Sequence, residues 1–256
     1  MTDSPDLVEK RETGVIRAFV ELSHELADGY DMIEMLTHLT ESCARLLDVA
    51  SAGLLLSDEK GTLHFMAASS ELTHYLELFQ LQRDEGPCLD CFRGGKAVLV
   101  PDLSAATERW PVFCEGASRA GFASVHALPM RLRGNVLGAL GLFGNSVGSL
   151  TEPDLDLAQA LAHVACVAIV NEKAAEDRAT IISQLQHALS SRIALEQAKG
   201  VIASSGGLEM EEAFAVLRRY ARDHGQKLSS VAAQVVNREL RSEALVQHAR
   251  SVAIIT

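Results

Sequence analysis

The sequence has no apolar run long enough to span a bilayer, and its mean hydropathy is close to zero at +0.11. It contains no P-loop, no GxGxxG pattern and no GxSxG nucleophile elbow, so the usual signals for nucleotide binding and serine hydrolysis are missing. The opening residues, MTDSPDLVEKRE, are acidic and polar and do not resemble a secretory or transit signal. A cytoplasmic protein that does not enter the membrane is therefore expected.

Cysteine is scarce and odd in number, with 5 residues, which favours reduced thiols over a disulfide framework. Cys88 and Cys91 form a CxxC pair, which can be a redox pair or half of a metal site, and Cys114 follows. No second CxxC and no His pair at zinc-finger spacing accompanies them, so no metal site is expected. Two interpretations stay open: thiols that only line a pocket, or sensor thiols that reshape the pocket when they oxidise.

Positive charge is rare in most of the chain and collects near the end. The formal net charge is −11, yet residues 179–256 contain nine Lys and Arg against seven Asp and Glu, a balance of +2 that leaves −13 for the first 178 residues. An acidic body repels nucleic acid, so only the C-terminal portion is suited to bind it.

The first two thirds of the chain predict an α+β domain. Helical spacing of apolar residues indicates helices over 7–27 and 32–47, and two apolar strands flank a turn at 58–61. A helix through Leu72, Leu76 and Phe79 precedes a loop-rich region, 85–104, with a short strand at 97–100. Two further strands, 124–132 and 136–144, close the unit, which is typical of an antiparallel sheet flanked by helices.

Between residues 152 and 203 the apolar residues alternate in steps of four and three, which is heptad spacing. Asn171 and Arg178 are polar residues at seam positions, where they can fix register and partner. We expect a continuous helix that forms a homodimer through a coiled coil; two separate helices, the first packed on the sheet, are the alternative. The predicted dimer seam consists of Leu157, Leu161, Val164, Asn171, Ile182, Leu185 and Leu189.

Residues 191–240 hold three short amphipathic helical patterns in a row, each broken by Gly or Ser. A small, basic, all-α module of three helices at the end of an acidic chain suggests an output domain that holds a phosphate backbone. This stretch closely resembles the ANTAR domain, an RNA-binding module. The matching residues are Arg192, Glu196, Gln197, Ala198, Lys199, Gly200, Ala213, Phe214, Leu217, Arg218, Ala221, Arg222, Leu228, Val231, Ala232, Val235 and Val236.

The ANTAR resemblance implies a dimer that binds stem-loops in nascent mRNA and controls transcription termination. The residues assigned to RNA contact on this basis are Arg192, Gln197, Lys199, Arg218, Arg222 and Lys227. The alternative is a solvated face whose cations pair with Glu196, Glu211 and Glu212. One departure is Glu209 at the start of the second helix, where Ser, Thr or Asp is the more usual cap.

The α+β body is similar to the GAF domain, a sensory fold, over about residues 30–170. The segments that carry this likeness are EGPC at 85–88, VPDL at 100–103, WP at 110–111 and HALPMRLRGNVLGALGLF at 126–143. The likeness implies a pocket for a small molecule whose identity, like any cofactor, stays unknown. The candidate pocket residues are Cys88, Cys91, Phe92, Trp110, Phe113, Cys114 and His126.

These observations predict a regulator without enzymatic activity. Its expected parts are an N-terminal helix (1–29), a GAF-like sensory domain (30–170), a coiled-coil linker helix (171–190), an ANTAR domain (191–240) and a C-terminal tail (241–256). An input at the sensory pocket would shift the linker helix and so pair or separate two ANTAR modules. Three alternatives stay open: a DNA-binding regulator, a protein-binding adaptor, and a GAF-type thiol reductase or redox sensor that uses the cysteines.

Overall fold

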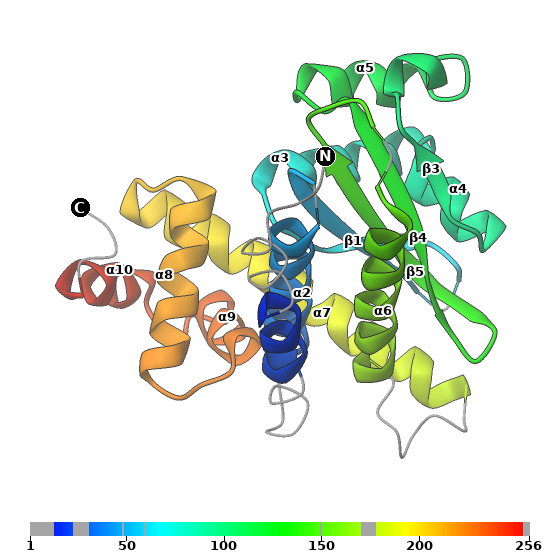
Figure 1. Cartoon of the computed structure of the whole chain (residues 1–256). Helices are drawn as coiled ribbons and strands as arrows, with labels where there is room; N and C mark the ends of the chain where they lie inside the picture. The colour runs from blue at the N-terminus through cyan, green and yellow to red at the C-terminus, as the bar shows by residue number, and fades with distance from the viewer. Residues whose placement is uncertain are drawn as a thin grey trace. The chain divides into compact units, whose positions relative to one another are not determined.

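A computed structural model describes residues 13–22, 31–47, 49–58, 60–148, 150–169 and 178–252, with only the backbone described for 178–185. The chain divides into two compact units. The first, the sheet unit, comprises residues 1–29 and 35–185, and the second, the helical unit, comprises residues 30–34 and 186–256. Figure 1 shows both, and each is described below by itself. Among the described residues no helix combines the length and apolar character that a membrane span requires.

The sheet unit is built on a five-stranded sheet in the order β2-β1-β5-β4-β3. The strands are β1 (Ser51–Ser57), β2 (Leu63–Ala68), β3 (Val98–Val100), β4 (Ser124–Leu132) and β5 (Asn135–Gly144). All four pairings are antiparallel, which confirms the predicted fold class. The chain pairs neighbouring strands through two tight hairpins, β1–β2 and β4–β5.

Turn chemistry explains both hairpins. In the β4–β5 turn, Arg133 and Gly134 both take positive φ, 50° and 86°, the type I′ geometry that matches the twist of the flanking strands. In the β1–β2 turn, the Asp58 carboxylate accepts from the backbone N–H of Lys60 at 2.8 Å and of Thr62 at 2.9 Å. A short polar side chain that bonds its own backbone is how Asp stabilises turns.

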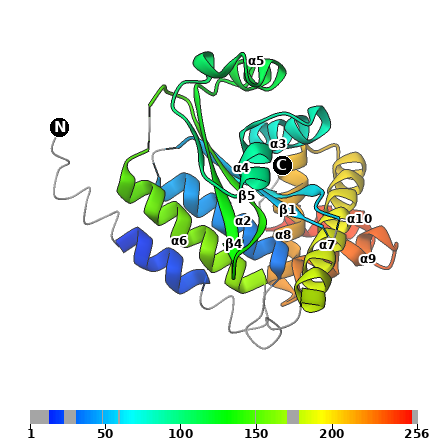
Figure 2. The same cartoon turned by 90° about the vertical axis from the view of Figure 1, so that its right-hand side faces the viewer.

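Helices cover both faces of the sheet. α2 (Met32–Leu46) and α6 (Glu152–Ile169) run along one face, and α3 (Glu71–Arg83) and α4 (Pro87–Gly94) along the other (Figure 2). A short 3₁₀ turn, η1 (Leu103–Ala106), leads to α5 (Pro111–Arg119), which packs against α3. The sheet is therefore buried on both sides, and nearly every residue of β1, β4 and β5 is buried.

Two local expectations in the sheet unit were wrong. The CxxC pair lies on a helix, α4, and not in a loop. Pro87 begins this helix, and Gly95, with φ of 60°, ends it. Its eight residues lie among Gly and Pro, which usually indicate a loop. On α3, Leu72 is 56% exposed, while Glu77 and Gln80 are fully buried. Leu76 is buried in the core and Phe79 packs against the same cluster, so apolar spacing placed the helix correctly and failed only at Leu72.

The predicted continuous helix falls on two described helices, α6 and α7 (Arg178–Gly206). α6 packs on β4, and its Leu161 is fully buried, while Leu157 and Val164 are half-buried. Asn171 and the side chains of Ile182 and Leu185 lie outside the described part. Leu189 on α7 is half-buried. Continuity of the helix and the coiled-coil dimer stay predictions.

The helical unit contains the C-terminal part of α7 with α8 (Met210–Asp223), α9 (Leu228–Val236) and α10 (Ser242–Ser251). Glu209 does cap α8: its own N–H donates to Glu212 Oε2 at 2.9 Å, as in a capping box. The stretch expected to be a tail contains α10, whose Leu245 and Ala249 are fully buried and which packs on α8. The helical unit is therefore larger than the predicted three-helix module.

Candidate sensory core and nucleic-acid interface

A buried carboxyl lies at the centre of the sheet unit. Glu77 on α3 is 0% exposed and accepts a hydrogen bond from Gln80 Nε2 and one from Cys88 Sγ at 3.6 Å. It lies over two glycines, Gly53 on β1 and Gly141 on β5, which are cross-strand partners. A Cβ on either glycine would lie 2.6 or 2.7 Å from Glu77 Oε1. The pair of glycines thus leaves the space that the carboxyl fills.

Burial controls the ionisation of this cluster. Loss of solvation raises the pKa of Glu77 to about 8, and the hydrogen bonds from Cys88 and Gln80 offset only part of that rise. Burial, with the Glu77 carboxyl as a second cause, raises the pKa of the Cys88 thiol well above its usual range. The cluster therefore holds a neutral carboxyl beside a neutral thiol over most of the physiological range.

The other thiols of the sheet unit are also buried and protonated. All five cysteines are free and buried, and burial raises the pKa of Cys91 to about 12. Burial and the neighbouring Glu85 raise the pKa of Cys114. The thiolate is the nucleophile in redox and reductase chemistry, so these environments disfavour both.

Six of the seven candidate pocket residues lie on the α3–α5 side of the sheet, in two core clusters. Trp110, Phe113 and Cys114 belong to one cluster, and Cys88 and Cys91 belong to the other, with Phe92 packed against it. At the edge of the first cluster Asp90 accepts from Arg109 Nη2 at 2.6 Å and Trp110 Nε1 at 3.2 Å. Arg109 lies over the Trp110 ring, 4.4 Å from its centroid.

His126 lies on the opposite face. Its neighbours on β4, Val125 and Ala127, belong to the α3–α5 side, and side chains alternate along a strand. With Ser124 and Asp154 it lines a cavity of about 340 Å³ beside the N-terminus of α6. The imidazole is 2% exposed, its Nδ1 has no partner among the described atoms, and burial lowers its pKa. The candidate residues are thus split between two sides of the sheet.

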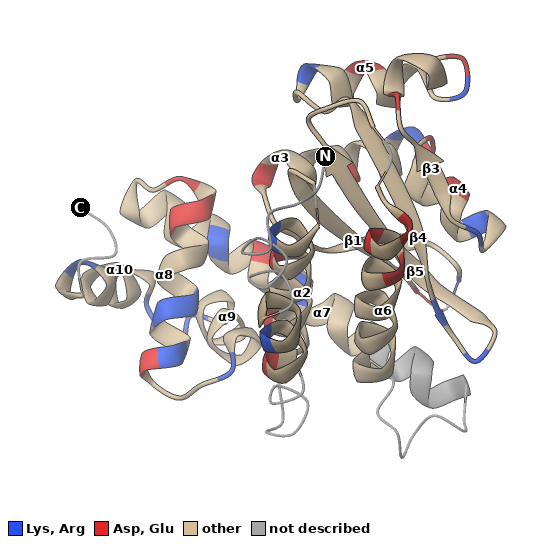
Figure 3. Cartoon of the chain, in the orientation of Figure 1, with Lys and Arg blue, Asp and Glu red and all other residues tan. Residues whose placement is uncertain are grey.

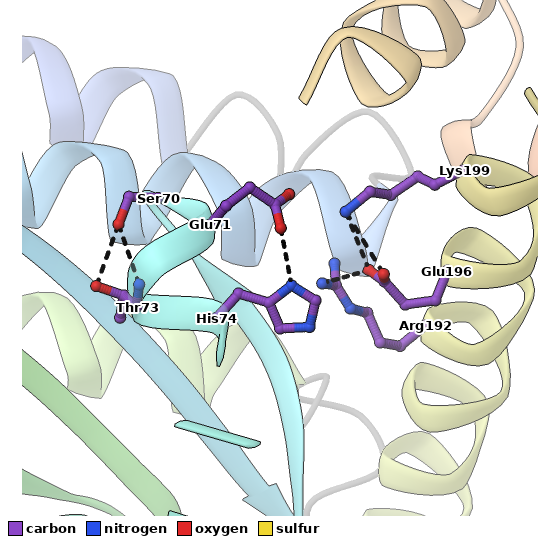
Figure 4. Close-up of polar contacts among 7 residues, drawn as sticks. All are labelled: Ser70, Glu71, Thr73, His74, Arg192, Glu196 and Lys199. Atoms are coloured by element: carbon purple, nitrogen blue, oxygen red, sulfur yellow. Dashed lines mark hydrogen bonds and ion pairs between the residues drawn. The ribbon is translucent and has the colours of Figure 1, made fainter. Parts of the chain in front are cut away.

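Sequence reasoning missed Thr73, Glu77 and Gln80, three polar residues of α3 that are fully buried. Ser70 caps this helix by accepting from Thr73 N–H at 3.2 Å, and His74 contacts Glu71 (Figure 4). The signal was present: Thr73, Glu77 and Gln80 recur at helical spacing on one side of α3.

In the helical unit, Arg192 and Lys199 share one carboxylate. Glu196 lies between them on α7, with Arg192 Nη2 2.6 Å from Oε1 and Lys199 Nζ 3.5 Å from Oε2 (Figure 4). The Lys199 ammonium also lies 5.8 Å from the centroid of the Phe214 ring on α8. In the structure Arg192 and Lys199 are 8% and 3% exposed. The pairing with Glu196 expected for a solvated face is present, but these cations are buried.

The four other candidates for RNA contact are more accessible. Gln197, Arg222 and Lys227 are exposed, and the half-buried Arg218 has its Nε 3.5 Å from Glu34 Oε1. Figure 3 shows Lys and Arg along α8 and near α10, with acids at the start of α8. Acids in the first turn and Arg222 in the last turn complement the helix dipole.

Tyr220 takes part in a ring cluster. Its ring stacks on His224 at a centroid distance of 3.9 Å, and the His248 ring of α10 meets it edge-on at 5.4 Å. Asp223 joins α8 to α10 because His248 Nε2 lies 2.9 Å from its Oδ2. Arg219, also on α8, lies with its Nε 2.7 Å from the same oxygen. Tyr220 is half-buried and packs against both histidine rings. Within the described ranges, no group of three or more His, Cys, Asp or Glu could hold a metal ion.

Comparison with known protein families gives a clear result. A model of the GAF domain matches residues 30–170, and a model of the ANTAR domain matches residues 183–236. Comparison with curated proteins found no matching relative.

Solved structures resemble part of the chain at low identity. The GAF domain region of a putative membrane protein from Geobacter sulfurreducens is 23% identical over 54% of this chain and 93% of its own, with a TM-score of 0.46. A GAF domain of an Acinetobacter phosphoenolpyruvate-protein phosphotransferase is 15% identical over 68% of this chain and 99% of its own, with a TM-score of 0.47. Free methionine-R-sulfoxide reductase from Neisseria meningitidis is 16% identical over 67% of this chain and 91% of its own, also with a TM-score of 0.47.

Proposed function

Because this chain belongs to the GAF domain family and carries a C-terminal ANTAR domain, we propose that it binds stem-loops of nascent transcripts as a homodimer and thereby controls transcription termination. The two domains together indicate an RNA-binding antitermination regulator with a sensory domain, in signal transduction and transcription regulation. We further propose that the protein acts in the cytoplasm.

The observation that carries the proposal is the exposed charge of the helical unit. Gln197, Arg222 and Lys227 offer an amide, a guanidinium and an ammonium to solvent. Loop RNA is recognised through phosphates, splayed bases and stacking, and Arg serves all three by charge, fork geometry and planarity. The remaining acidic chain repels RNA, which limits binding to this surface.

Arg192 and Lys199 contribute in a different way. Their shared partner Glu196 offsets one of their two positive charges, and each must exchange a carboxylate oxygen for a phosphate oxygen to contact RNA. Removing the charge with Glu196→Gln should therefore strengthen RNA binding, whereas Lys199→Ala should weaken it.

The sensory unit supplies the input. A small molecule in the cavity beside His126, or a change in the core around Glu77, would shift α6, because this helix packs on the sheet. The buried thiols with raised pKa count against a reductase and against a thiol sensor. Asn171→Leu and Arg178→Leu should lock the proposed dimer; unchanged dimerisation and RNA binding would refute transmission through this helix.

The direct test is a competition between hairpin RNA and duplex DNA of equal length over a salt series. The full chain should prefer the hairpin, and Lys199→Ala and Arg218→Ala should bind it more weakly with a shallower salt dependence. Arg119→Ala is the matched control, because it removes an exposed cation from the sheet unit. Equal affinity for duplex DNA and hairpin RNA would refute the proposed function.

A further inference from the structure

A groove of about 650 Å³ runs between α7, α9 and α10 of the helical unit. Its apolar side is formed by Val201, Val235 and Leu240, and its polar rim by Arg238 and Arg241. Val201 is 44% exposed, so this wall of the groove is accessible. Both arginines are exposed, and neither forms an ion pair with any residue that the structure describes.

Arg238 has a backbone conformation that disfavours it. Its φ is +63°, in the left-handed region, directly after the cap of α9. There its N–H donates to Val235 O at 3.1 Å, and the Glu239 N–H donates to Gln234 O at 2.8 Å. These two bonds define a Schellman motif, in which the left-handed residue is usually glycine.

The helices before it end in the expected way. After α7 the left-handed residue is Gly207, with φ of 66°, and after α8 it is Gly225, with φ of 60°. The third helix makes the same turn with an arginine, at the cost in backbone energy that any side chain incurs there. A residue kept in a disfavoured conformation is a reason to look for a function of its side chain.

The chemistry of the groove selects its occupant. An apolar wall flanked by exposed guanidinium groups suits a ligand that is flat and apolar on its faces and negatively charged beside them. An unpaired nucleobase with its flanking phosphates has this character. Glu243 and Gln247 also line the groove and can hydrogen-bond the polar edge of a base.

We propose that the groove between α7, α9 and α10 takes up one unpaired loop nucleobase of the bound RNA, while Arg238 and Arg241 hold the phosphates on either side of it. The groove extends beyond the segment matched by the ANTAR model, which ends at residue 236, because α10 and both arginines follow it. This inference rests on the proposed function and adds to it Arg238, which was not among the residues predicted to contact RNA, and Arg241 and α10, which were predicted to lie in a tail.

The decisive variant is Arg238→Gly, because stability and affinity should change in opposite directions. Affinity for an RNA hairpin with a randomised loop should fall about 10-fold, and the salt slope should become shallower by about 0.7–0.9, the loss of one phosphate contact. Relief of the left-handed strain should raise Tm by about 2–4 °C. Arg241→Gln should give the same loss of binding without the gain in Tm, and Arg238→Lys should keep the salt slope.

Arg250→Gln is the matched control, because Arg250 is an exposed cation of α10 that does not line the groove. It should bind like the unaltered chain. Suppose that the unaltered chain prefers the hairpin. If Arg238→Gly and Arg241→Gln then bind it as tightly as the unaltered chain, or if Arg250→Gln loses as much affinity as they do, the groove assignment alone is overturned. Failure of the unaltered chain to prefer the hairpin would instead overturn the proposed function.

A second measurement tests the base itself. Replacing loop nucleotides one at a time by abasic sites should weaken binding about 10-fold at one position, the worth of one stacked base. Ala244→Trp, on the exposed α10 wall of the groove, blocks the space without removing a charge. This variant should lose the abasic effect. An abasic effect that persists in Ala244→Trp would show that the base binds elsewhere.

Discussion

The two units of this protein differ in the ionisable groups at their candidate sites. The sheet unit encloses groups that burial keeps uncharged: Glu77 and Cys88 are fully enclosed, His126 is 2% exposed, and burial shifts the pKa of each toward the neutral form. The helical unit keeps the cations Arg222 and Lys227 at its surface and pairs its buried cations, Arg192 and Lys199, with Glu196. Two stacked layers around a sheet can enclose polar groups, whereas short helices around a small core leave most charges in water.

The difference teaches which part can respond to what. A buried neutral carboxyl or imidazole responds to changes in solvation, to pH and to a ligand that supplies a hydrogen bond. Exposed cations respond to polyanions and to salt. The division of labour between sensing and RNA binding therefore has a physical basis in burial.

The largest expected effect concerns thiol reactivity. Because all five cysteines are buried and the pKa of Cys43, Cys91 and Cys166 is raised to about 12, alkylation by iodoacetamide at pH 8 should be at least ~100-fold slower in the native protein than in denaturant. The exposed helix position Ser118→Cys is the positive control and should react quickly. Rapid labelling of Cys88 or Cys91 in the native state would restore the redox interpretation.

The next effect tests the space over the glycine pair. Gly141→Ala places a Cβ 2.7 Å from Glu77 Oε1 and 2.9 Å from Cys88 Sγ, so the sheet unit should lose about 1–3 kcal/mol of stability. Urea unfolding measures it. Gly94→Ala is the control because nothing lies within 4 Å of its new Cβ. Equal stability of both variants would mean that the carboxyl does not occupy the space above the glycines.

A smaller effect appears as pH dependence. The folded pKa of Glu77, about 8, lies above its ordinary value of 4.5, so the stability it contributes is full at low pH and is lost as pH rises toward 8. His126 has a lowered pKa, so its contribution makes stability rise with pH, and this contribution is complete at about pH 6.5. Between about pH 6.5 and 8, the fall in stability therefore comes from Glu77. There the protein should lose up to about 2 kcal/mol.

Glu77→Gln should remove this slope, since an amide fills the same space and does not titrate. Glu115→Gln changes an exposed acid on α5 and should leave the slope intact. Thermal unfolding at several pH values provides the measurement. A slope that is the same in Glu77→Gln and in the unaltered chain would contradict the assignment.

The smallest expected effect lies in the helical unit. Gly225→Ala puts a side chain at φ of 60°, so the helical unit should lose about 1 kcal/mol. Gly200→Ala, within α7 and with nothing near its new Cβ, should be neutral or slightly stabilising. The difference in the free energy of unfolding between Gly225→Ala and Gly200→Ala, together with the gain expected for Arg238→Gly, measures how much a side chain in the left-handed conformation destabilises the unit. No loss in Gly225→Ala would mean that the turn relaxes, and would weaken the argument from strain at Arg238.

Much of the fold was predictable from local pattern. The two hairpins follow from alternating apolar strands and turn residues such as Asp58 and Gly134, and α3 and α8 follow from helical spacing. α4 was missed because eight residues between Gly and Pro signals give too little periodicity. α10 was missed because its buried apolar positions, Leu245, Val246 and Ala249, are few.

The candidate sites were less predictable. Residue type and family likeness pointed to Arg222 and Lys227 as accessible cations, and both are exposed. Neither could tell that Arg192 and Lys199 share Glu196, because pairing depends on side-chain placement. The pocket candidates are divided between two faces because the side chain of His126 points to the face opposite those of its neighbours on β4. Which face that is depends on how β4 pairs within the sheet.

The sequence by itself determined the two-part organisation, the antiparallel class of the sheet unit and the concentration of positive charge near the C-terminus, because periodicity, turn chemistry and charge are local properties. Only the tertiary structure decided that Glu77 is enclosed above Gly53 and Gly141 and that Arg238 borders a groove. These facts depend on which distant residues exclude water from one another, and burial is a property of the packed chain and not of any segment of it.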